Sequence, residues 1–350
     1  MNLFFWKRPS RPARLPYQRD AHDRHVLFRP SDVDAGRQAG FESLARIDDE
    51  NFESRFLEVF PDAGSIKVAA RHASAPSDTL SAIFGARNSD ELKRKITRAA
   101  PGSHGGRFDI LRKIPPEDIH RMQRGKNWIG DLYAADLVMN TLTAAGVSLA
   151  DGSVFLDYGG SSGSLLRVLA CTYPAISFIG TDPVRASIQW ASDNLSTGNL
   201  KFLDQEQRPP SSAIETASID CITAISIFSH HGYGAFEAWM VEMHRILKPD
   251  AVLLFTAHGP GSVLNYQAQG IKPTLRYERI AHYLYAGGFA FEEVWIEKDD
   301  AGNDATTADW GNAFYTRETV ERLLGSGFKT EYFGPRGNQS NQDVYVVRKV

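Results

Sequence analysis

From about residue 126, short apolar runs alternate with longer segments whose apolar residues recur at helical spacing. The short runs predict strands and the longer segments predict helices. Strands that are apolar on both faces and separated by helices indicate a parallel sheet covered on both sides. The predicted strands are 154–156, 176–180, 200–203, 219–225 and 251–257, and the predicted helices are 131–145, 164–170, 184–194 and 235–247.

The C-terminal end of the chain has a different pattern. Residues 328–333 and 344–347 predict two strands, and the Gly/Asn/Gln-rich turn between them leaves no room for a helix. Two strands joined in this way pair antiparallel. We therefore predict an α/β fold, with a doubly wound, mostly parallel seven-stranded sheet that ends in an antiparallel hairpin.

The same pattern suggests the domain organisation. Residues 1–125 carry an Arg-rich arm and helical pieces at 52–60 and 90–99, without a chemical motif. We interpret them as a structural extension packed on the main domain, with a substrate-facing cap as the alternative. Residues 126–350 form the predicted main domain. Its segment 259–312 is too long for a simple crossover and predicts an inserted substrate lid, with a helix at 275–285 and an extended stretch at 289–297.

Composition narrows the class of protein. The apolar share of 42%, the charged share of 23% and the net charge of −3 are ordinary for a soluble globular protein and give no global reason to expect nucleic acid. Cys171 and Cys221 lie in apolar segments and read as small core residues, a usage that fits a reducing compartment. No apolar run approaches the ~20 residues of a membrane helix. We expect a cytoplasmic protein without a membrane partner.

The segment 154–163 carries the main chemical signal. Asp157 closes the first strand, and a loop of small residues then leads into a helix. Small side chains let a backbone approach a ligand closely, and the helix start offers unpaired N–H groups. A carboxylate before the glycines suits a ligand with a cationic group and would repel a pyrophosphate. The loop residues are Gly159, Gly160, Ser161 and Gly163.

The loop fits one nucleotide-binding pattern better than another. The dinucleotide pattern G-x-G-x-x-G, started at Gly159, meets Ser161 and Ser164 where glycines belong. The loop instead resembles the acidic-x-G-x-G-x-G motif of class I S-adenosylmethionine-dependent methyltransferases, with Ser161 in place of the middle glycine. The resemblance implies S-adenosyl-L-methionine as the cofactor. An ordinary tight connection between strand and helix is the alternative.

Asp182 supports an adenosine site. It ends the second strand 19 residues (182 − 163) past the last glycine of the loop, and Pro183 follows it. A carboxylate at that place can accept hydrogen bonds from both ribose hydroxyls of either a nicotinamide dinucleotide or S-adenosylmethionine. A helix N-cap next to Pro183 is the alternative and is compatible with that role.

Further segments extend the resemblance. It implies that Leu203 and Asp204, after the third strand, lie against the adenine; a solvated turn is the alternative for Asp204. The stretch 218–231 resembles the family's fourth motif, with a polar turn containing Ser226, and its Ser-x-Phe-Ser-His form is similar to a bacterial small-molecule branch. The junction 245–250 and the closing stretch 341–347 also resemble this family. The resemblance covers about residues 126–258 and 313–350.

Methyl transfer to a hydroxyl needs a base, and ligands of open α/β sheets lie beyond the carboxyl ends of the strands. His230, His231 and His258 follow the fourth and fifth strands and are the candidate bases, although a histidine there often only hydrogen-bonds the backbone. We predict no metal site, because no cysteine cluster or His-x-x-x-His pattern is present. The aromatic residues of the lid line an acceptor pocket or form a small core. They are Tyr283, Tyr285, Trp310 and Tyr315.

These patterns favour a methyltransferase that acts on a small organic acceptor, preferably at oxygen. Three alternatives remain at this point: a methyltransferase of protein or RNA, which the Arg-rich arm would support, a nicotinamide oxidoreductase, and a non-catalytic cofactor-binding or partner-binding protein. Asp157 and the missing glycines oppose the oxidoreductase. The sequence predicts neither the acceptor nor the oligomeric state.

Overall fold

The computed structural model describes residues 128–263, 286–292, 310–339 and 341–350, with isolated residues and pairs between 110 and 119 and between 280 and 305. The predicted Arg-rich arm, the helices at 52–60 and 90–99, Tyr285 and most of the helix at 275–285 lie outside the described residues.

The chain divides into two compact units. We call them the glycine-loop unit, with the described residues up to Glu206 and Ser212–Thr223, and the hairpin unit, with Gln207–Ser211 and the described residues from Ala224 onward.

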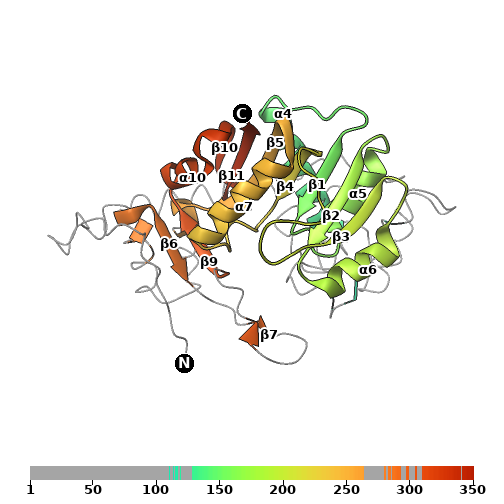
Figure 1. Ribbon diagram of the computed structural model, residues 1–350, viewed down its shortest axis with the longest axis horizontal. Coiled ribbons are helices and arrows are strands. Elements are labelled where there is room, and N and C mark those ends of the chain that lie inside the picture. The colour runs from blue at the N-terminus through green and yellow to red at the C-terminus, as the bar shows by residue number, and fades with distance from the viewer. Residues whose placement is uncertain are drawn as a thin grey trace, which may run out of the picture. The chain divides into compact units, whose positions relative to one another are not determined.

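The glycine-loop unit is a parallel sheet flanked by helices. Its four strands pair in the order β4, β1, β2, β3, all parallel, and α5 and α6 pack beside β2 and β3 (Figure 1). The interior is apolar, with Phe155 and Leu156 of β1 fully buried. The strands are β1 (Val154–Tyr158), β2 (Ser177–Asp182), β3 (Leu200–Asp204) and β4 (Ile219–Ala224), and the helices are α4 (Trp128–Ala144), α5 (Ser164–Thr172) and α6 (Arg185–Leu195).

The described pieces of the N-terminal extension pack on this unit. The Lys113 ammonium donates to the carbonyl of Asn194 at 2.7 Å, and the Arg167 guanidinium donates to the carbonyl of Lys113. Ser187 Oγ donates to the carbonyl of Ile119 at 3.4 Å. These contacts tie the described residues before α4 to α5 and α6.

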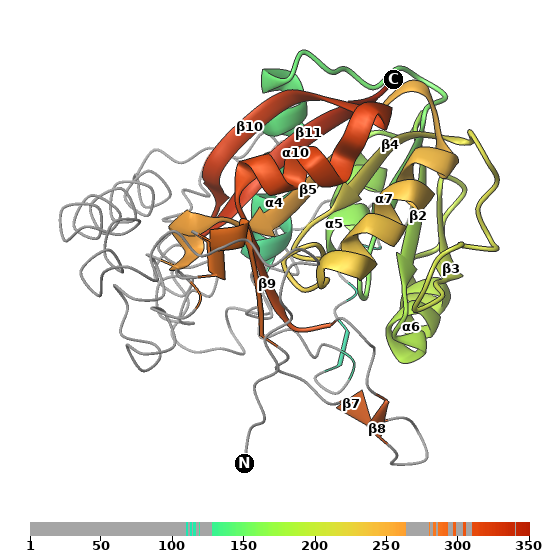
Figure 2. The same cartoon turned by 60° about the vertical axis from the view of Figure 1, so that its left-hand side comes forward.

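The hairpin unit is built on the antiparallel trio β10, β11 and β5. β9 pairs parallel with the last residue of β5 and antiparallel with β6. The helices α7 and α10 run side by side (Figure 2). The elements are α7 (Tyr233–Ile246), β5 (Leu247–His258), β6 (Phe289–Glu292), β7 (Glu297–Lys298), β8 (Asp304–Ala305), β9 (Asn312–Tyr315), α10 (Arg317–Leu324), the short 3-10 helix η6 (Gly325–Gly327), β10 (Phe328–Asn338) and β11 (Gln342–Lys349).

The predicted fold class is confirmed: the seven predicted strands are present, those of the glycine-loop unit are parallel, and the last two form the antiparallel pair. Most boundaries shift by one to three residues, and two differ more from the sequence prediction. β5 begins at Leu247, directly after α7, and β10 continues to Asn338 through residues that the composition assigned to a turn. Gly-rich segments can stay in a strand when bulges absorb the irregularity, and β10 shifts register between Gly334 and Asn338.

Candidate active site

The glycine loop alternates between left-handed and ordinary backbone conformations. Gly159, Ser161 and Gly163 have φ angles of 75°, 51° and 78°. The N–H groups of Gly159 and Gly160 both donate to the carbonyl of Thr181 at 2.9 Å, so the loop folds onto the end of β2. A Cβ on Gly163 would lie 2.7 Å from the Phe202 ring. The small residues of the motif are therefore required by conformation and by close packing.

Asp157 lies at the carboxyl end of β1 with its side chain buried. The Thr223 hydroxyl of β4 donates to its Oδ1 at 2.9 Å. A Cβ on Gly160 would lie 2.5 Å from its Oδ2, so the carboxylate packs directly against the loop backbone. A buried carboxylate is costly unless donors or a positive charge compensate it. The expected contact of Asp157 with a cationic group would supply such a charge and stays a prediction.

Asp182 ties β2 to both the loop and α6. Its Oδ2 accepts from the N–H of Ser161 at 2.9 Å, and its Oδ1 accepts from the N–H of Val184 at 2.8 Å. Asp182 is buried, whereas Pro183 is exposed. The N-cap of α6 is Val184, so Asp182 supports the turn before the helix rather than capping it directly.

The end of β3 lies beside that of β2. Asp182 pairs in register with Asp204, and Thr181 with Leu203. Asp204 is exposed and Leu203 is half-buried.

Sequence reasoning missed three residues beside these strands, Thr181, Thr223 and Gln205. Thr181 Oγ1 donates to Gln205 Oε1 at 2.8 Å. The one available signal was the position of Gln205, directly after the predicted adenine contacts Leu203 and Asp204.

In the hairpin unit, Ser226 forms a strained turn after β4. Its φ is 63°, a left-handed conformation that serine rarely adopts. Two side chains hold it: its N–H donates to Thr256 Oγ1 at 2.8 Å, and its hydroxyl accepts from Gln342 Nε2 at 2.6 Å. Gln342, at the start of β11, was not predicted as a site residue. Its polar character in front of an apolar strand was the available signal.

His230 has an imidazole of defined orientation. Its Nδ1 lies 2.8 Å from the carbonyl of Gly311. A carbonyl only accepts, so Nδ1 carries the proton, and in the neutral ring Nε2 is the basic nitrogen. Burial lowers the pKa of His230, although the hydrogen bond to Gly311 opposes this shift. Neutral imidazole is therefore favoured at physiological pH.

His231 lies in an aromatic cluster. Its ring is 5.6 Å from Phe228, 6.3 Å from Trp239 and 5.1 Å from Trp310. Its buried Nε2 has no hydrogen-bond partner in the described part of the chain. Burial, together with the neighbouring His230, lowers the pKa of His231 to about 3. These surroundings suit a neutral ring that packs within the core.

His258 ends β5 and is buried. Its ring stacks on Phe314 at 5.0 Å and lies 6.1 Å from the His230 ring. Its Nε2 is 3.5 Å from Gln342 Nε2. The structure thus brings His230, His231 and His258 together in the hairpin unit, each in different surroundings.

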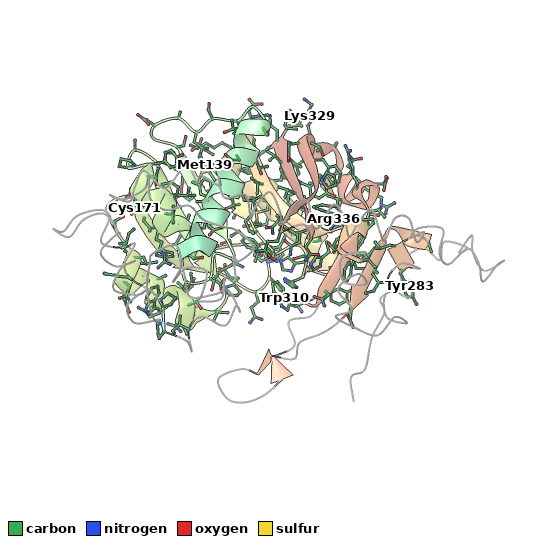
Figure 3. All side chains as sticks on the ribbon, turned by 180° about the vertical axis from the view of Figure 1, so that it is seen from behind. Met139, Cys171, Tyr283, Trp310, Lys329 and Arg336 are labelled. Atoms are coloured by element: carbon green, nitrogen blue, oxygen red, sulfur yellow. The ribbon has the colours of Figure 1, made fainter. Side chains whose placement is uncertain are left out.

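The aromatic residues of the lid were predicted to line an acceptor pocket or to form a small core. Tyr315 is fully buried against Phe236 and Phe289, and its hydroxyl donates to the carbonyl of His231, so it belongs to a core. Trp310, labelled in Figure 3, is half-buried, with its ring 5.2 Å from His230. Tyr283, also labelled there, is half-buried.

Neither a metal site nor a membrane-spanning helix is found among the described residues. No group of three or more His, Cys, Asp or Glu side chains among them could hold a metal ion. No helix within the described ranges is long and apolar enough to cross a membrane. Cys171 and Cys221 are both buried, as expected of core residues.

Comparison with known proteins gives a family match. Residues 130–297 match a family model described as a methyltransferase domain. No curated protein matches the chain.

Many solved structures resemble it at low identity. An S-adenosylmethionine-dependent methyltransferase from Methanosarcina mazei is 19% identical with a TM-score of 0.42, over 61% of this chain and 97% of that one. A putative methyltransferase from Listeria monocytogenes is 13% identical with a TM-score of 0.39, over 62% and 98%. The 1,6-didemethyltoxoflavin-N1-methyltransferase of Burkholderia thailandensis is 13% identical with a TM-score of 0.39, over 61% and 76%.

The family match over residues 130–297 confirms the predicted enzyme class and its methyl donor. The roles of the individual site residues stay predictions, and so do the limits of the domains.

Proposed function

We propose that this methyltransferase moves a methyl group from S-adenosylmethionine to a hydroxyl oxygen of a small organic acceptor, as in the bacterial small-molecule branch that its motifs resemble. The observation that carries the proposal is the orientation of His230, whose Nδ1–H donates to the Gly311 carbonyl and leaves Nε2 as the basic nitrogen. A hydroxyl acceptor needs such a base, because its proton must leave as the new bond to carbon forms.

The residues of the glycine-loop unit fit the donor. S-adenosylmethionine supplies an electrophilic methyl group on a positively charged sulfur. Asp157 would face a cationic group of the donor. Asp182 would accept from the ribose hydroxyls, since a carboxylate accepts about four hydrogen bonds and two backbone N–H groups already fix its orientation. Leu203 and Asp204 would lie against the adenine, as the resemblance implies.

His230 suits proton removal in two ways. Its lowered pKa keeps the ring neutral, so that Nε2 can take a proton at physiological pH. Once the ring is protonated, the Gly311 carbonyl accepts from a charged donor, and such a hydrogen bond is about twice as strong as a neutral one. The ring is thus held in one orientation before and after the proton moves.

Trp310 supports a small organic acceptor. Its half-buried indole lies beside His230, and aromatic faces near a base can orient an organic molecule without a charge of their own. We assign Ser226 a cofactor contact on the resemblance of its turn to the family's fourth motif. The cytoplasmic location and the absence of a nucleic-acid partner belong to the same proposal.

Calorimetric titration with S-adenosylhomocysteine tests the cofactor half, with NAD as the competing ligand. We expect binding of S-adenosylhomocysteine and none of NAD. Asp182→Ala removes hydrogen bonds to a charged group that are worth about 1.5–3 kcal/mol, so the affinity should fall about 10- to 100-fold. Asp193→Ala, at an exposed carboxylate of α6, is the matched control and should bind as the wild type does.

The acceptor half is tested by incubating the protein with S-adenosylmethionine and a panel of small hydroxylated compounds, and measuring S-adenosylhomocysteine formed. Methylation of a hydroxyl that depends on His230 supports the proposal. Methylation of protein or RNA with no small acceptor would overturn it, and so would a preference for NAD in the titration.

A further inference from the structure

Gln342 is the centre of a buried polar cluster in the hairpin unit. It opens β11 and pairs in register with His258, the last residue of β5. Only 5% of Gln342 is exposed, yet its amide makes hydrogen bonds on both sides. Thr256 Oγ1 and Asn338 Nδ2 donate to its Oε1 at 2.7 and 2.9 Å.

The orientation of this amide is fixed by its partners. Thr256 Oγ1 accepts from the N–H of Ser226, so its own proton points to Gln342. Asn338 Nδ2 can only donate. A flipped Gln342 amide would place its NH₂ group against two donors, so the oxygen must face Thr256 and Asn338, and the NH₂ group must face the other way.

The NH₂ group of Gln342 therefore donates to what lies opposite. One proton goes to Ser226 Oγ at 2.6 Å. The second faces Ser229 Oγ at 3.3 Å and His258 Nε2 at 3.5 Å. Nε2 of His258 can accept from this amide only in the tautomer that leaves Nε2 unprotonated and carries the proton of the neutral ring on Nδ1.

We infer that Gln342 is a positioning residue, which fixes His258 in the Nδ1–H tautomer and holds the hydroxyl of Ser226 in place. The inference rests on the proposed function for its consequence, since His258 and Ser226 are predicted site residues. His230 and His258, whose rings lie 6.1 Å apart and nearly perpendicular, then differ in role. Nε2 of His230 is a base, whereas His258 keeps Nε2 against Gln342 and carries its proton on the buried Nδ1.

The tautomer is measured by NMR of full-length protein labelled with ¹⁵N-histidine, in which ring nitrogens with and without a proton have distinct shifts. His258→Gln identifies the resonances of His258 by their loss. The test variant is Gln342→Glu, which keeps the length and an acceptor for Thr256 and Asn338 but turns the donor into an acceptor. Ser229→Ala is the control, because it removes one partner of Gln342 and keeps the contacts of Gln342 with His258 and Ser226.

In the wild type and in Ser229→Ala we expect a protonated Nδ1 and an unprotonated Nε2 for His258. In Gln342→Glu the proton should move to Nε2, because that nitrogen now faces an acceptor. A wild-type spectrum with a protonated Nε2 overturns the inference, and so does a folded Gln342→Glu protein whose His258 spectrum matches the wild type. If Gln342→Glu does not fold, the wild-type spectrum alone decides.

The spectrum is independent of the proposed function. Titration with S-adenosylhomocysteine on the same samples reports the cofactor separately. An Nδ1–H tautomer without cofactor binding would sustain the positioning by Gln342 and refute the methyl donor. Cofactor binding with an Nε2–H tautomer would support the methyl donor and refute the positioning by Gln342.

Discussion

The glycine loop and the histidine cluster hold their polar groups in different ways. Beside the loop, Asp182 binds the N–H groups of residues 21 and two positions away, and the N–H groups of Gly159, Gly160 and Gly163 donate to backbone carbonyls. In the cluster, His230 binds a carbonyl 81 positions away, and Gln342 binds a hydroxyl 116 positions away. The first region is shaped largely by local chain geometry, and the second by side chains that only the tertiary fold brings together.

The largest expected effect lies in the cluster. His230→Gln should lower methyl transfer about 10²- to 10⁴-fold, the usual loss when a general base is removed. The affinity for S-adenosylhomocysteine should stay within about twofold, because Asp157 and Asp182, which we assign to the cofactor's methionine and ribose moieties, belong to the glycine-loop unit. Rates are measured as S-adenosylhomocysteine formed with the acceptor found in the panel.

His244→Gln is the control for this change, because that histidine lies at the end of α7, away from the cluster, and should leave the rate unaltered. An undiminished rate in His230→Gln would remove His230 from the chemistry.

Within the glycine loop, we expect the largest loss of stability from a substitution at Gly163. Gly163→Ala adds a methyl group 2.7 Å from the Phe202 ring and forces alanine to a φ of 78°. The left-handed conformation costs about 1–2 kcal/mol and overpacking about 1–3 kcal/mol, so the free energy of unfolding should fall by about 3 kcal/mol. Urea denaturation measures the change.

Two glycines of the same unit separate the causes. Gly152→Ala has positive φ but open space and should cost only about 1 kcal/mol, and Gly198→Ala has neither problem and should be close to neutral. Equal losses in all three variants would refute the packing argument.

The pH dependence of stability distinguishes the cluster. His231 has a pKa of about 3 in the folded protein and about 6.5 when unfolded. The unfolded chain therefore binds the extra proton between these values, and stability is lost as pH falls from 6.5 toward 3, by up to about 1.4 kcal/mol per pH unit. His231→Phe should remove this contribution of His231 to the loss of stability at low pH.

Asp343 acts in the opposite sense. Burial raises its pKa to about 6, so its contribution to stability is lost as pH rises from about 4 to 6. Unfolding curves of the wild type and His231→Phe between pH 5 and 7 isolate the histidine, because the contribution of Asp343 is common to both. Parallel pH profiles for the two proteins would contradict the burial of a neutral His231.

The smallest expected effects compare two serines in left-handed conformations. Ser161→Gly should stabilise the protein by up to about 1 kcal/mol. The hydrogen bond to Asp182 comes from the backbone N–H and is kept, and glycine adopts a φ of 51° without strain. Ser226→Gly also relieves its φ but leaves the buried Gln342 donor without Ser226 Oγ, which costs about 1–3 kcal/mol. We expect a net loss of about 1 kcal/mol, and thermal unfolding of both variants checks the opposite signs.

The sequence predicted the loop well because its chemistry is written locally. Asp157, Gly159, Gly163 and Asp182 follow one another along one strand–loop–helix–strand passage, and backbone geometry leaves few ways to arrange them. The departure at Ser161 was also readable, and the structure shows the left-handed φ that a glycine would relieve there. The seven strands were also predictable from a local pattern, the alternation of short apolar runs with segments of helical periodicity.

The cluster was predicted as a set of candidates only. The three histidines follow strand ends, where ligands of such sheets lie, but nothing in their spacing distinguishes them. Gln342 and the Gly311 carbonyl, which fix the rings of His258 and His230, are too far along the chain for any local pattern to pair them with a histidine.

The amino-acid sequence by itself therefore determined the order of strands and helices, the shape of the glycine loop and the class of cofactor. The first two follow from hydrophobic periodicity and from the backbone freedom of a few residues, and the cofactor follows from the resemblance of the loop motif to that of methyltransferases. Only the tertiary structure decided which histidine is buried among aromatic rings, which one presents a basic nitrogen and which one faces an amide. Burial and hydrogen-bond partners set the protonation of an imidazole, and both come from residues that are distant in the chain.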